Sequence, residues 1–378
     1  MTEADFLIVG GGMAGASAGF FLSDHGRVVL LEREAHPGYH TTGRSAALYE
    51  PAYGNAAIRA LTAVGKPFFD APPTGFAAHP LLSPRGAMTV ARADRADEVA
   101  RVVAEVRTLV PAVREITAAE ARAMVPALRP DWVAAASINP AAMDMDVHAI
   151  HQGFLRGLRA RGGRIVTDAE VTGAGRTHRG WTVETGSGTF VAPILVNAAG
   201  AWCDVVARAC GVAPLGLVPK RRTGFIFPVP VGVDAAAWPM VCDVDETFYF
   251  KPEAGKLLGS PADETPVEPC DVQPEELDIA IAADRIQTAC DIEIRRIERS
   301  WAGLRSFFPD KTPTVGFDPA ADGFFWLAGQ GGYGIQTSPG MGRLTAALAT
   351  GGSVPADLTD LGLRVQDLSP ARFGGDRQ

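Results

Sequence analysis

The chain has 378 residues, of which 47% are hydrophobic, and its net charge is −8. This length allows two domains, and the apolar fraction is sufficient for a sizeable core. The negative charge argues against nucleic acid as a main partner, because phosphate backbones are bound by clustered Lys and Arg. No apolar run is long enough to span a bilayer. We therefore expect no transmembrane segment, while loose association with a membrane surface stays open.

Cysteine and histidine usage gives no sign of a disulfide framework or a metal centre. The five cysteines show no C-x-x-C spacing and are odd in number, which is typical of reduced thiols in a cytoplasmic protein. His148 and His151 are three residues apart in a helix expected over 146–161. A metal pair is one interpretation, but no carboxylate signature accompanies it, so we favour a structural role and predict no metal. The first apolar run has only four residues, and we interpret it as a strand rather than a signal peptide.

The first expected elements form a dinucleotide-binding fingerprint. Apolar residues 6–9 are followed by Gly10, Gly12 and Gly15 in G-x-G-x-x-G spacing, and a second apolar run ends at Glu32. This order predicts a strand, a glycine turn, a helix and a second strand. The helix N-terminus would bind a pyrophosphate, and Glu32 would accept a ribose hydroxyl. The stretch by itself does not distinguish NAD from FAD.

A long loop without periodicity follows over residues 33–53. Gly43-Arg44-Ser45 within it could face the cofactor, although a plain surface connection is the alternative. The patterns beyond it alternate between helix and strand. We expect helices over 55–69, 94–110 and 146–161, a capping box at 117–120, strands over 86–92, 132–139 and 164–167, and a hairpin over 181–191.

Two later stretches, like the opening one, consist of an apolar run followed by glycine and other small residues. The apolar run 193–197 leads into small residues around Gly200, which would let the backbone lie against a flat ligand. The strand expected over 323–329 leads into a glycine-rich loop, 330–337, and a helix over 340–349. A helix N-terminus there would suit the negative charge of a reduced flavin. Between these stretches lie expected strands over 220–230, 240–243, 248–252 and 294–308 and a helix over 275–289.

This order predicts an α/β protein with a discontinuous, Rossmann-like cofactor domain. A smaller α+β substrate domain, built on a largely antiparallel sheet, is interleaved with it, and the pocket lies between the two. We assign 1–80, 145–216 and 300–370 to the cofactor domain and 81–144 and 217–299 to the substrate domain. Residues 371–378 have little to pack against and are expected to be a disordered tail.

Together these motifs resemble the FAD-dependent D-amino-acid oxidase family, which includes glycine oxidase and sarcosine oxidase. The resemblance covers residues 3 to 370 and is strongest to the D-arginine dehydrogenase branch. The stretches that carry it are 36–40, 52–54, 79–85, 219–222, 301–306 and 329–337.

The resemblance implies a Rossmann-like FAD-binding domain with non-covalent FAD and the oxidative deamination of D-amino acids. Hydride would pass from the α-carbon to flavin N5, and the imino acid would hydrolyse to a 2-keto acid and ammonia. A dehydrogenase is expected, with a quinone or another acceptor, while oxidase activity stays open. N-methyl, cyclic imino or 2-hydroxy acids are alternative substrates, and a flavin-binding assembly protein without turnover is a remote alternative.

The resemblance also assigns the substrate site. Arg222 and Arg305 would bind the substrate carboxylate, Tyr53 and Tyr249 would donate to it, and the Gly332 carbonyl would accept from the amine. Each could instead be a structural residue. The cofactor-binding residues would be Gly10, Gly12, Met13, Ala14, Gly15, Glu32, Arg33, Thr42, Arg44, Ser45, Ala46, Val171, Ala199, Gly200, Trp202, Gly303, Gly331, Gly332, Tyr333, Gly334, Ile335, Gln336 and Thr337.

The expected side-chain pocket departs from the D-arginine-preferring relatives. Leu48 stands where they carry a histidine, and Ala87 where they carry an acid, which makes this pocket more apolar. Glu50 replaces a small hydroxyl residue and could meet a basic substrate side chain, or it could face solvent. We therefore predict a broad specificity for D-amino acids, with D-arginine and D-lysine left open and apolar substrates favoured.

Overall fold

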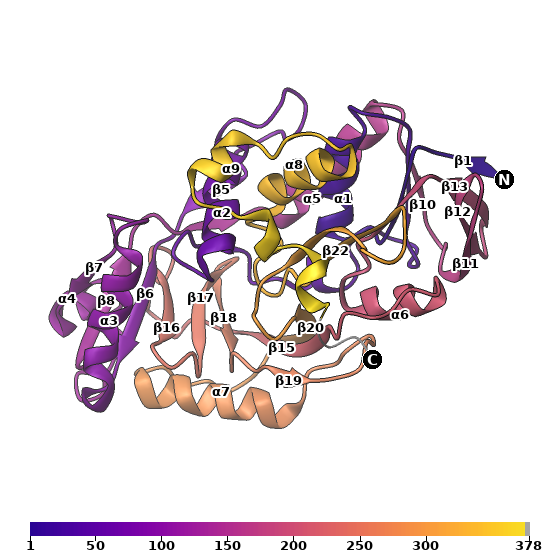
Figure 1. Cartoon of the computed structure of the whole chain (residues 1–378). Helices are drawn as coiled ribbons and strands as arrows, with labels where there is room; N and C mark the ends of the chain where they lie inside the picture. Colours follow the sequence, from indigo (N-terminus) through magenta and orange to yellow (C-terminus); the bar gives the residue numbers. More distant parts are fainter. Residues whose placement is uncertain (375–378) are drawn as a thin grey trace.

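A computed structural model, which describes residues 1–374, has a six-stranded sheet at the centre of its upper part (Figure 1). Five neighbouring strands are parallel, and the last is antiparallel to its neighbour. Strands β2, β3 and β22 are buried along their whole length, because parallel strands are covered on both faces. In sheet order the strands are β10 (Arg164–Val166), β3 (Val28–Leu31), β2 (Phe6–Val9), β14 (Ile194–Asn197), β22 (Phe324–Ala328) and β21 (Thr314–Phe317).

Helices cover one face of this sheet, and a smaller sheet lies against the other. The helical side forms one core cluster, and it contains α1 (Met13–Leu22), α2 (Ala56–Asp70), α5 (Val147–Ala160) and α8 (Ser338–Ala349). The other side forms a second cluster, which includes Trp181 and Phe190. That side is built from β1 (Thr2–Glu3), β11 (Val171–Thr177), β12 (Gly180–Thr185), β13 (Gly188–Ala192) and α6 (Cys203–Ala209).

A second large sheet lies below the first in Figure 1 and is antiparallel except where β16 meets β6. Helix α7 (Glu276–Ala289) covers its outer face, and the core between them includes Phe225, Phe250 and Ile286. In sheet order the strands are β19 (Thr265–Pro266), β15 (Val218–Phe227), β18 (Lys256–Ser260), β17 (Tyr249–Glu253), β16 (Met240–Asp243), β6 (Ala87–Ala91), β8 (Ala135–Asn139) and β7 (Arg114–Ile116), with β20 (Arg299–Phe307) also paired to β15.

The remaining elements complete the two halves. A three-stranded sheet joins the long loop after β3 to the region around residue 144. Its strands are β4 (Leu48–Tyr49), β9 (Met143–Met145) and β5 (Leu82–Pro84). The remaining helices are α3 (Ala96–Val106), α4 (Ala118–Met124) and α9 (Ala356–Asp360).

The predicted fold class is confirmed, while several boundaries differ. Strand β20, which we assigned to the cofactor domain, pairs along its whole length with β15 of the large sheet. The helix expected to reach residue 110 ends at Val106, and the strand expected from residue 132 begins at Ala135. Strand β11 and helix α6 were not predicted, because their glycines and short length mask the periodicity. The division into two domains stays a prediction.

The expected tail is ordered at its start. Residues Pro370–Phe373 form a 3₁₀ turn, and the ring of Phe373 packs on Phe308 with centroids 4.7 Å apart. Arg372 donates to the Thr312 carbonyl at 2.7 Å and pairs with Asp310. The sequence pattern could not reveal these partners, since they lie about 60 residues away. Residues 375–378 of the expected tail lie outside the described residues.

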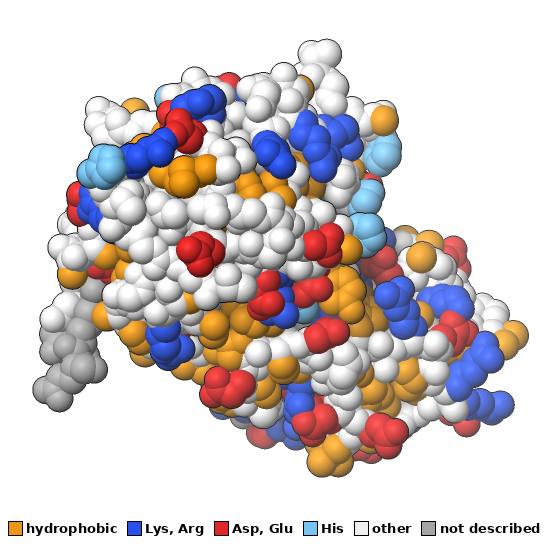
Figure 2. Space-filling view, turned by 90° about the vertical axis from the view of Figure 1, so that its right-hand side faces the viewer, with side chains coloured by type: hydrophobic (Ala, Val, Ile, Leu, Met, Phe, Trp, Pro, Cys, Tyr) orange, Lys and Arg blue, Asp and Glu red, His pale blue; other side chains and the backbone are white. Residues whose placement is uncertain are grey.

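The surface gives two further observations. The face seen in Figure 2 carries acidic and basic side chains in mixture, so no large field of one sign covers it. Within residues 1–374, no helix combines the length and the apolar character needed to cross a bilayer.

Candidate active site

A long cavity lies between the two large sheets, and its first wall is the glycine turn after β2. Gly10 has φ +105°, and a Cβ on it would lie 2.4 Å from the Ala198 carbonyl oxygen. A Cβ on Gly15 would lie 1.9 Å from the Gly10 carbonyl oxygen, so helix and strand pack backbone to backbone. Helix α1 begins after Gly12 without a side-chain cap, and only the Met13 N–H is taken, by Thr42 Oγ1 at 3.0 Å. This helix start can receive an anion.

Glu32 lies at the end of β3 and lines the same cavity. Its carboxylate accepts the Gly11 N–H at 2.8 Å and the Glu34 N–H at 2.9 Å. Burial raises the pKa of Glu32, the two backbone bonds and His40 lower it, and the charge of Glu34 raises it. A carboxylate has about four acceptor positions. It therefore retains capacity for a ribose hydroxyl.

Most of the predicted cofactor-binding residues line this cavity. They are Gly10, Gly12, Met13, Ala14, Glu32, Arg33, Thr42, Arg44, Ser45, Ala46, Val171, Ala199, Gly200, Trp202, Gly303, Gly331, Gly332, Gly334 and Ile335.

Four predicted cofactor residues lie elsewhere. Gly15 packs against Gly10, and the Tyr333 ring packs on Tyr53 with centroids 4.9 Å apart. The Gln336 amide bonds the Glu50 backbone and Thr62, while Thr337 precedes α8 and donates to the Tyr333 carbonyl. Gly15 belongs to the first glycine turn, while the other three belong to the glycine-rich loop and point away from the cavity. The motif identified the loop but could not tell which of its side chains turn inward.

Several cavity residues were not predicted as cofactor contacts, because they belong to strands and loops without a nucleotide signature. Thr223, Gly224 and Trp301 come from the paired strands β15 and β20, and a Cβ on Gly224 would lie 2.9 Å from the Trp301 ring. His40 also lines the cavity, with its ring 4.6 Å from that of Trp202. His151, by contrast, bonds the Gly11 carbonyl at 2.8 Å, which is a structural role.

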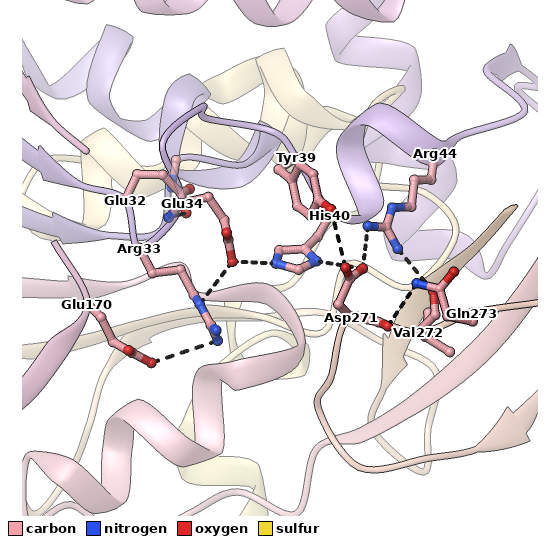
Figure 3. Close-up of polar contacts among 11 residues, drawn as sticks. Glu32, Arg33, Glu34, Tyr39, His40, Arg44, Glu170, Asp271, Val272 and Gln273 are labelled. Carbon is pink, nitrogen blue, oxygen red and sulfur yellow. Dashed lines mark hydrogen bonds and ion pairs between the residues drawn. The ribbon is translucent and has the colours of Figure 1, made fainter. Parts of the chain in front are cut away.

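A polar network connects the two halves of the protein across one side of the cavity (Figure 3). Asp271 lies between Arg44, which donates to its carboxylate, and His40, whose Nδ1 is 3.9 Å away. The Tyr39 hydroxyl donates to Asp271 at 3.2 Å, and His40 Nε2 contacts Glu34 at 2.9 Å. The hydrogen bond from Arg44 lowers the pKa of Asp271, so this carboxylate is ionised at neutral pH.

Arg44 therefore has a different surrounding from the one we expected. Its guanidinium donates to the carbonyls of Val272 at 3.2 Å and Ala302 at 3.0 Å as well as to Asp271. The Trp301 indole in turn donates to the Arg44 carbonyl at 3.0 Å. Arg44 borders the cavity, but its charged end fastens the 39–44 loop to the segment around residue 271.

At the other end of the cavity, Arg305 is a cation without a counter-ion. Its side chain is half-buried and lines the cavity, yet it makes no hydrogen bond or ion pair within residues 1–374. Burial lowers the pKa of Arg305, but Tyr53, Tyr249 and Tyr333 and the negative charge of Glu246 keep it above its ordinary value. A Cβ on Gly332 would lie 2.9 Å from Arg305 Nη1, so the glycine gives the guanidinium its space.

Arg222 and Tyr249 lie on the same wall. Arg222 is 8% exposed and lies on β15, where its residue faces Gly303 of β20 in the pairing register. Tyr249 begins β17 and lines the cavity beside Arg222 and Arg305. Tyr53 is packed behind them against Tyr333, and burial raises the pKa of its phenol, which stays protonated. Two cations and two phenols thus converge, which suits a carboxylate ligand.

Two of the three residues predicted for the side-chain pocket, Glu50 and Ala87, lie next to Asn139, while Leu48 lies on β4. The Glu50 carboxylate accepts from the Asn139 amide and from the Ala52 N–H at 2.9 Å, both on Oε1. Asn139 pairs with Ala87 in the β6–β8 register, and Leu48 pairs with Asp144 of β9. None of the three lies on the cofactor cavity itself. Burial raises the pKa of Glu50 to about 7, although the Ala52 and Asn139 bonds oppose this.

Comparison with known protein families identifies the family to which the chain belongs. The model of the FAD dependent oxidoreductase family, DAO, matches residues 5–348. The chain belongs to this family. The recognition made from the motifs is therefore confirmed at the level of the family.

Known proteins of this kind resemble the chain only in part or at low identity. FAD-dependent oxidoreductase domain-containing protein 1 of Xenopus laevis is 29% identical over 182 residues, 42% of this chain and 35% of that protein. Mitochondrial sarcosine dehydrogenase of Homo sapiens is 27% identical over 209 residues, 50% of this chain and 22% of that protein. The chain thus matches about a third or less of these relatives' length. The glycine oxidase structure from Geobacillus kaustophilus has a TM-score of 0.85 at 22% identity and covers 98% and 99% of the two chains, which shows a shared fold.

FAD is the cofactor of this DAO protein, as expected, and the cavity fits it. Ser306 Oγ and Gln330 Nε2 are buried on the cavity wall without a hydrogen-bond partner among the described residues. Gly200, with φ +57°, has no atom within 4 Å of the place a Cβ would take. The helix start at Gly12 would hold the pyrophosphate, and the residues from Gly331 to Ile335 would border the flavin.

The network around Asp271 leads to a prediction about cofactor retention. Asp271→Asn removes the charge that holds Arg44, Tyr39 and His40 together, so we expect FAD to dissociate about threefold to tenfold faster. The measurement is the rise of flavin fluorescence after dilution. Asp291→Asn, an exposed change without an ion pair, is the control. Equal release rates in all three proteins would show that the network does not retain FAD.

Proposed function

We propose that this protein is an FAD-dependent dehydrogenase that oxidatively deaminates D-amino acids to 2-keto acids and ammonia. The observation that carries the proposal is Arg305, a guanidinium on the cavity wall that makes no ion pair within residues 1–374, near Arg222 and three phenols. An enclosed, unpaired cation costs several kcal/mol unless a ligand compensates it. A substrate carboxylate is such a ligand.

The chain would position the substrate rather than act on it covalently. Arg305 and Arg222 hold the carboxylate, Tyr53 and Tyr249 donate to it, and the Gly332 carbonyl accepts from the amine. FAD, when bound, supplies the acceptor for the hydride of the α-carbon. Loss of that hydride and of an amine proton leaves an imine, which water converts to the keto acid and ammonia. Much of the catalysis is then orientation.

The D configuration and the electron acceptor belong to the same proposal and are supported by the resemblance, while the cytoplasmic location is supported by the cysteine usage. The acceptor would be a quinone or another small molecule. The sarcosine dehydrogenase relative makes N-methyl amino acids the second candidate class.

The experiment that tests the proposal is anaerobic reduction of the bound flavin by a panel of substrates. The panel contains D- and L-amino acids, sarcosine, D-proline and 2-hydroxy acids, and oxygen uptake is followed in parallel. Flavin bleaching by D-amino acids with slow oxygen uptake is the expected result. Bleaching by sarcosine or hydroxy acids alone would replace the proposal, and no bleaching at all would favour a protein without turnover.

Glu50 leads to a prediction about pH and specificity. Its pKa of about 7 means that the carboxyl is neutral below this pH and negative above it. If Glu50 reads the substrate side chain, the ratio of kcat/KM for D-arginine to that for D-leucine rises about threefold to tenfold from pH 6 to pH 8. The side-chain charge of D-arginine does not change over this range.

The matched control is Glu50→Gln, which keeps an oxygen for the Ala52 N–H and the Asn139 amide but cannot ionise. Its D-arginine to D-leucine ratio should be flat with pH. Glu50→Ala provides a second measurement. If Glu50→Ala leaves the ratio unchanged from that of the wild type, Glu50 is not the residue that reads the side chain.

A further inference from the structure

Tyr53, one of the two phenols assigned to the substrate carboxylate, lies in a tight turn between β4 and α2. Its N–H donates to the Glu50 carbonyl at 3.1 Å, and Pro51 occupies the second position of the turn, where its fixed φ is favourable. Its ring packs on that of Tyr333, with centroids 4.9 Å apart. Because residues 50–55 lie outside the helices and strands, the position of the phenol depends on the contacts of the turn itself.

Both ends of the peptide group that joins Ala52 to Tyr53 are hydrogen-bonded. The Tyr53 N–H at one end bonds Glu50, and the Ala52 carbonyl at the other end accepts from Arg59 Nε at 3.0 Å. A peptide group is planar, so these two bonds fix the orientation of the whole unit and the direction in which the chain enters Tyr53. The preceding peptide group is held as well, because the Ala52 N–H donates to Glu50 Oε1 at 2.9 Å.

Arg59 is itself held by two partners. It lies near the start of α2, its side chain is 14% exposed, and its Nη2 pairs with Glu105 Oε1 of α3 at 2.9 Å. A guanidinium is planar and its N–H groups point in fixed directions, so bonds at Nε and Nη2 together set its plane. Helix α3 also contacts the turn directly, because Ala52 packs against a cluster of buried valines in α3 and the segment after it, Val103, Val106, Val110 and Val113.

We propose that Arg59 is a positioning residue for Tyr53. It holds the peptide group before Tyr53 in one orientation, and this orientation sets where the phenol lies relative to the substrate carboxylate. Arg59 is not among the residues that line the cavity, so it acts through Tyr53 and not by contact with substrate or FAD. The inference rests on the proposed function, which makes Tyr53 a donor to the substrate carboxylate.

The first test is Arg59→Met, which keeps the length of the side chain and removes its donors. The measurement is anaerobic flavin reduction at several concentrations of D-leucine, which gives a Kd and a limiting rate. The Kd should rise about threefold to tenfold, because a displaced phenol loses its hydrogen bond to a charged carboxylate. The limiting rate should change less than about twofold, since the carboxylate is bound alike before and during hydride transfer.

A double-mutant cycle separates positioning from general loosening of the structure. Tyr53→Phe keeps the ring and removes the hydroxyl, and by itself it should raise the Kd of D-leucine about threefold to tenfold. If Arg59 acts through this hydroxyl, adding Arg59→Met to Tyr53→Phe should raise the Kd by less than about twofold more. General loosening would instead give the full effect of Arg59→Met in both backgrounds.

Arg101→Met is the matched control. Arg101 lies on α3, is 61% exposed, and has its Nη1 3.7 Å from the same carboxylate, Glu105. The substitution is of the same kind but leaves the Ala52 carbonyl bonded, so the Kd should stay at the wild-type value. Arg59→Lys serves if Arg59→Met fails to fold. An ammonium group cannot reproduce bonds at two guanidinium nitrogens, so the Kd should rise about twofold to threefold, and this rise should also disappear in Tyr53→Phe.

The outcomes separate this inference from the proposed function. If D-leucine reduces the wild-type flavin and its Kd is the same in the Arg59 variants, Arg59 does not position Tyr53. Additive effects of Arg59→Met and Tyr53→Phe, or an equal rise in Arg101→Met, would overturn the inference as well. So would a wild-type Kd in Tyr53→Phe, because the phenol would then not bind the carboxylate. If no D-amino acid reduces the flavin of the wild type, the proposed function itself fails.

Discussion

Replacing Arg305 by Met should lower kcat/KM for every D-amino acid by about 10²- to 10⁴-fold, equivalent to about 3–5 kcal/mol of lost stabilisation. The substrate carboxylate would then enter a site that has lost a cation without an ion pair among the described residues, while Arg222 keeps its contact with Glu264. Met has a similar length and no charge, so the cavity wall is largely preserved. The measurement is anaerobic flavin reduction as a function of substrate concentration.

Two comparisons make this result specific. Arg295→Met, at an exposed arginine that pairs only with Glu293, should leave kcat/KM at the wild-type value. Arg305→Lys should recover only part of the loss, because an ammonium group cannot form the two parallel bonds of a guanidinium. Near-normal kcat/KM in Arg305→Met, with FAD fully bound, would remove Arg305 from the site and with it the main support for the proposed function.

Gly15→Ala should give protein that retains little FAD. The added Cβ would lie 1.9 Å from the Gly10 carbonyl oxygen, a backbone atom that the turn holds in place. Either α1 moves away from β2 or the turn changes shape, and overpacking of this kind costs about 1–3 kcal/mol or more. In both cases the helix start loses its position. We expect the ratio of flavin to protein after purification to fall at least about tenfold.

Gly175→Ala is the control for this substitution. Gly175 lies in β11, and no atom is within 4 Å of the place its Cβ would take. That variant should keep its FAD and its thermal stability. If purified Gly15→Ala protein were fully loaded with flavin, the turn would accommodate the added methyl group, and the prediction would be wrong.

Local chemistry explains which elements could be predicted. The strand β2, the turn at Gly10 and the helix α1 follow from an apolar run, three spaced glycines and small residues, all within about 20 positions. The capping box at Thr117 was predicted for the same reason, and both of its hydrogen bonds are present. Strand β20 could not be placed from its sequence, which does not state which sheet it joins, and it pairs with β15 of the large sheet.

At the end of the cavity that would bind substrate, the residues could be named from the sequence, but their partners could not. Arg222, Arg305, Tyr53 and Tyr249 were named from a resemblance, and their place in the chain does not reveal their partners. Glu264 is 42 residues from Arg222, so no local pattern could connect them. Arg44 lines the cavity, as expected of a cofactor residue, but its guanidinium also pairs with Asp271, which is 227 residues away. Such contacts depend on how the two sheets are placed.

By itself, the sequence determined the family, the FAD fingerprint and the order of most elements, because these depend on spacing along the chain. Only the tertiary structure decided which cations are compensated and which loop residues face the cavity. Within residues 1–374, Arg305 makes no ion pair, while Arg222 contacts Glu264 and Arg44 pairs with Asp271. The physical reason is that the net charge of a site is set by distances between residues far apart in sequence, and these distances exist only after the sheets have packed.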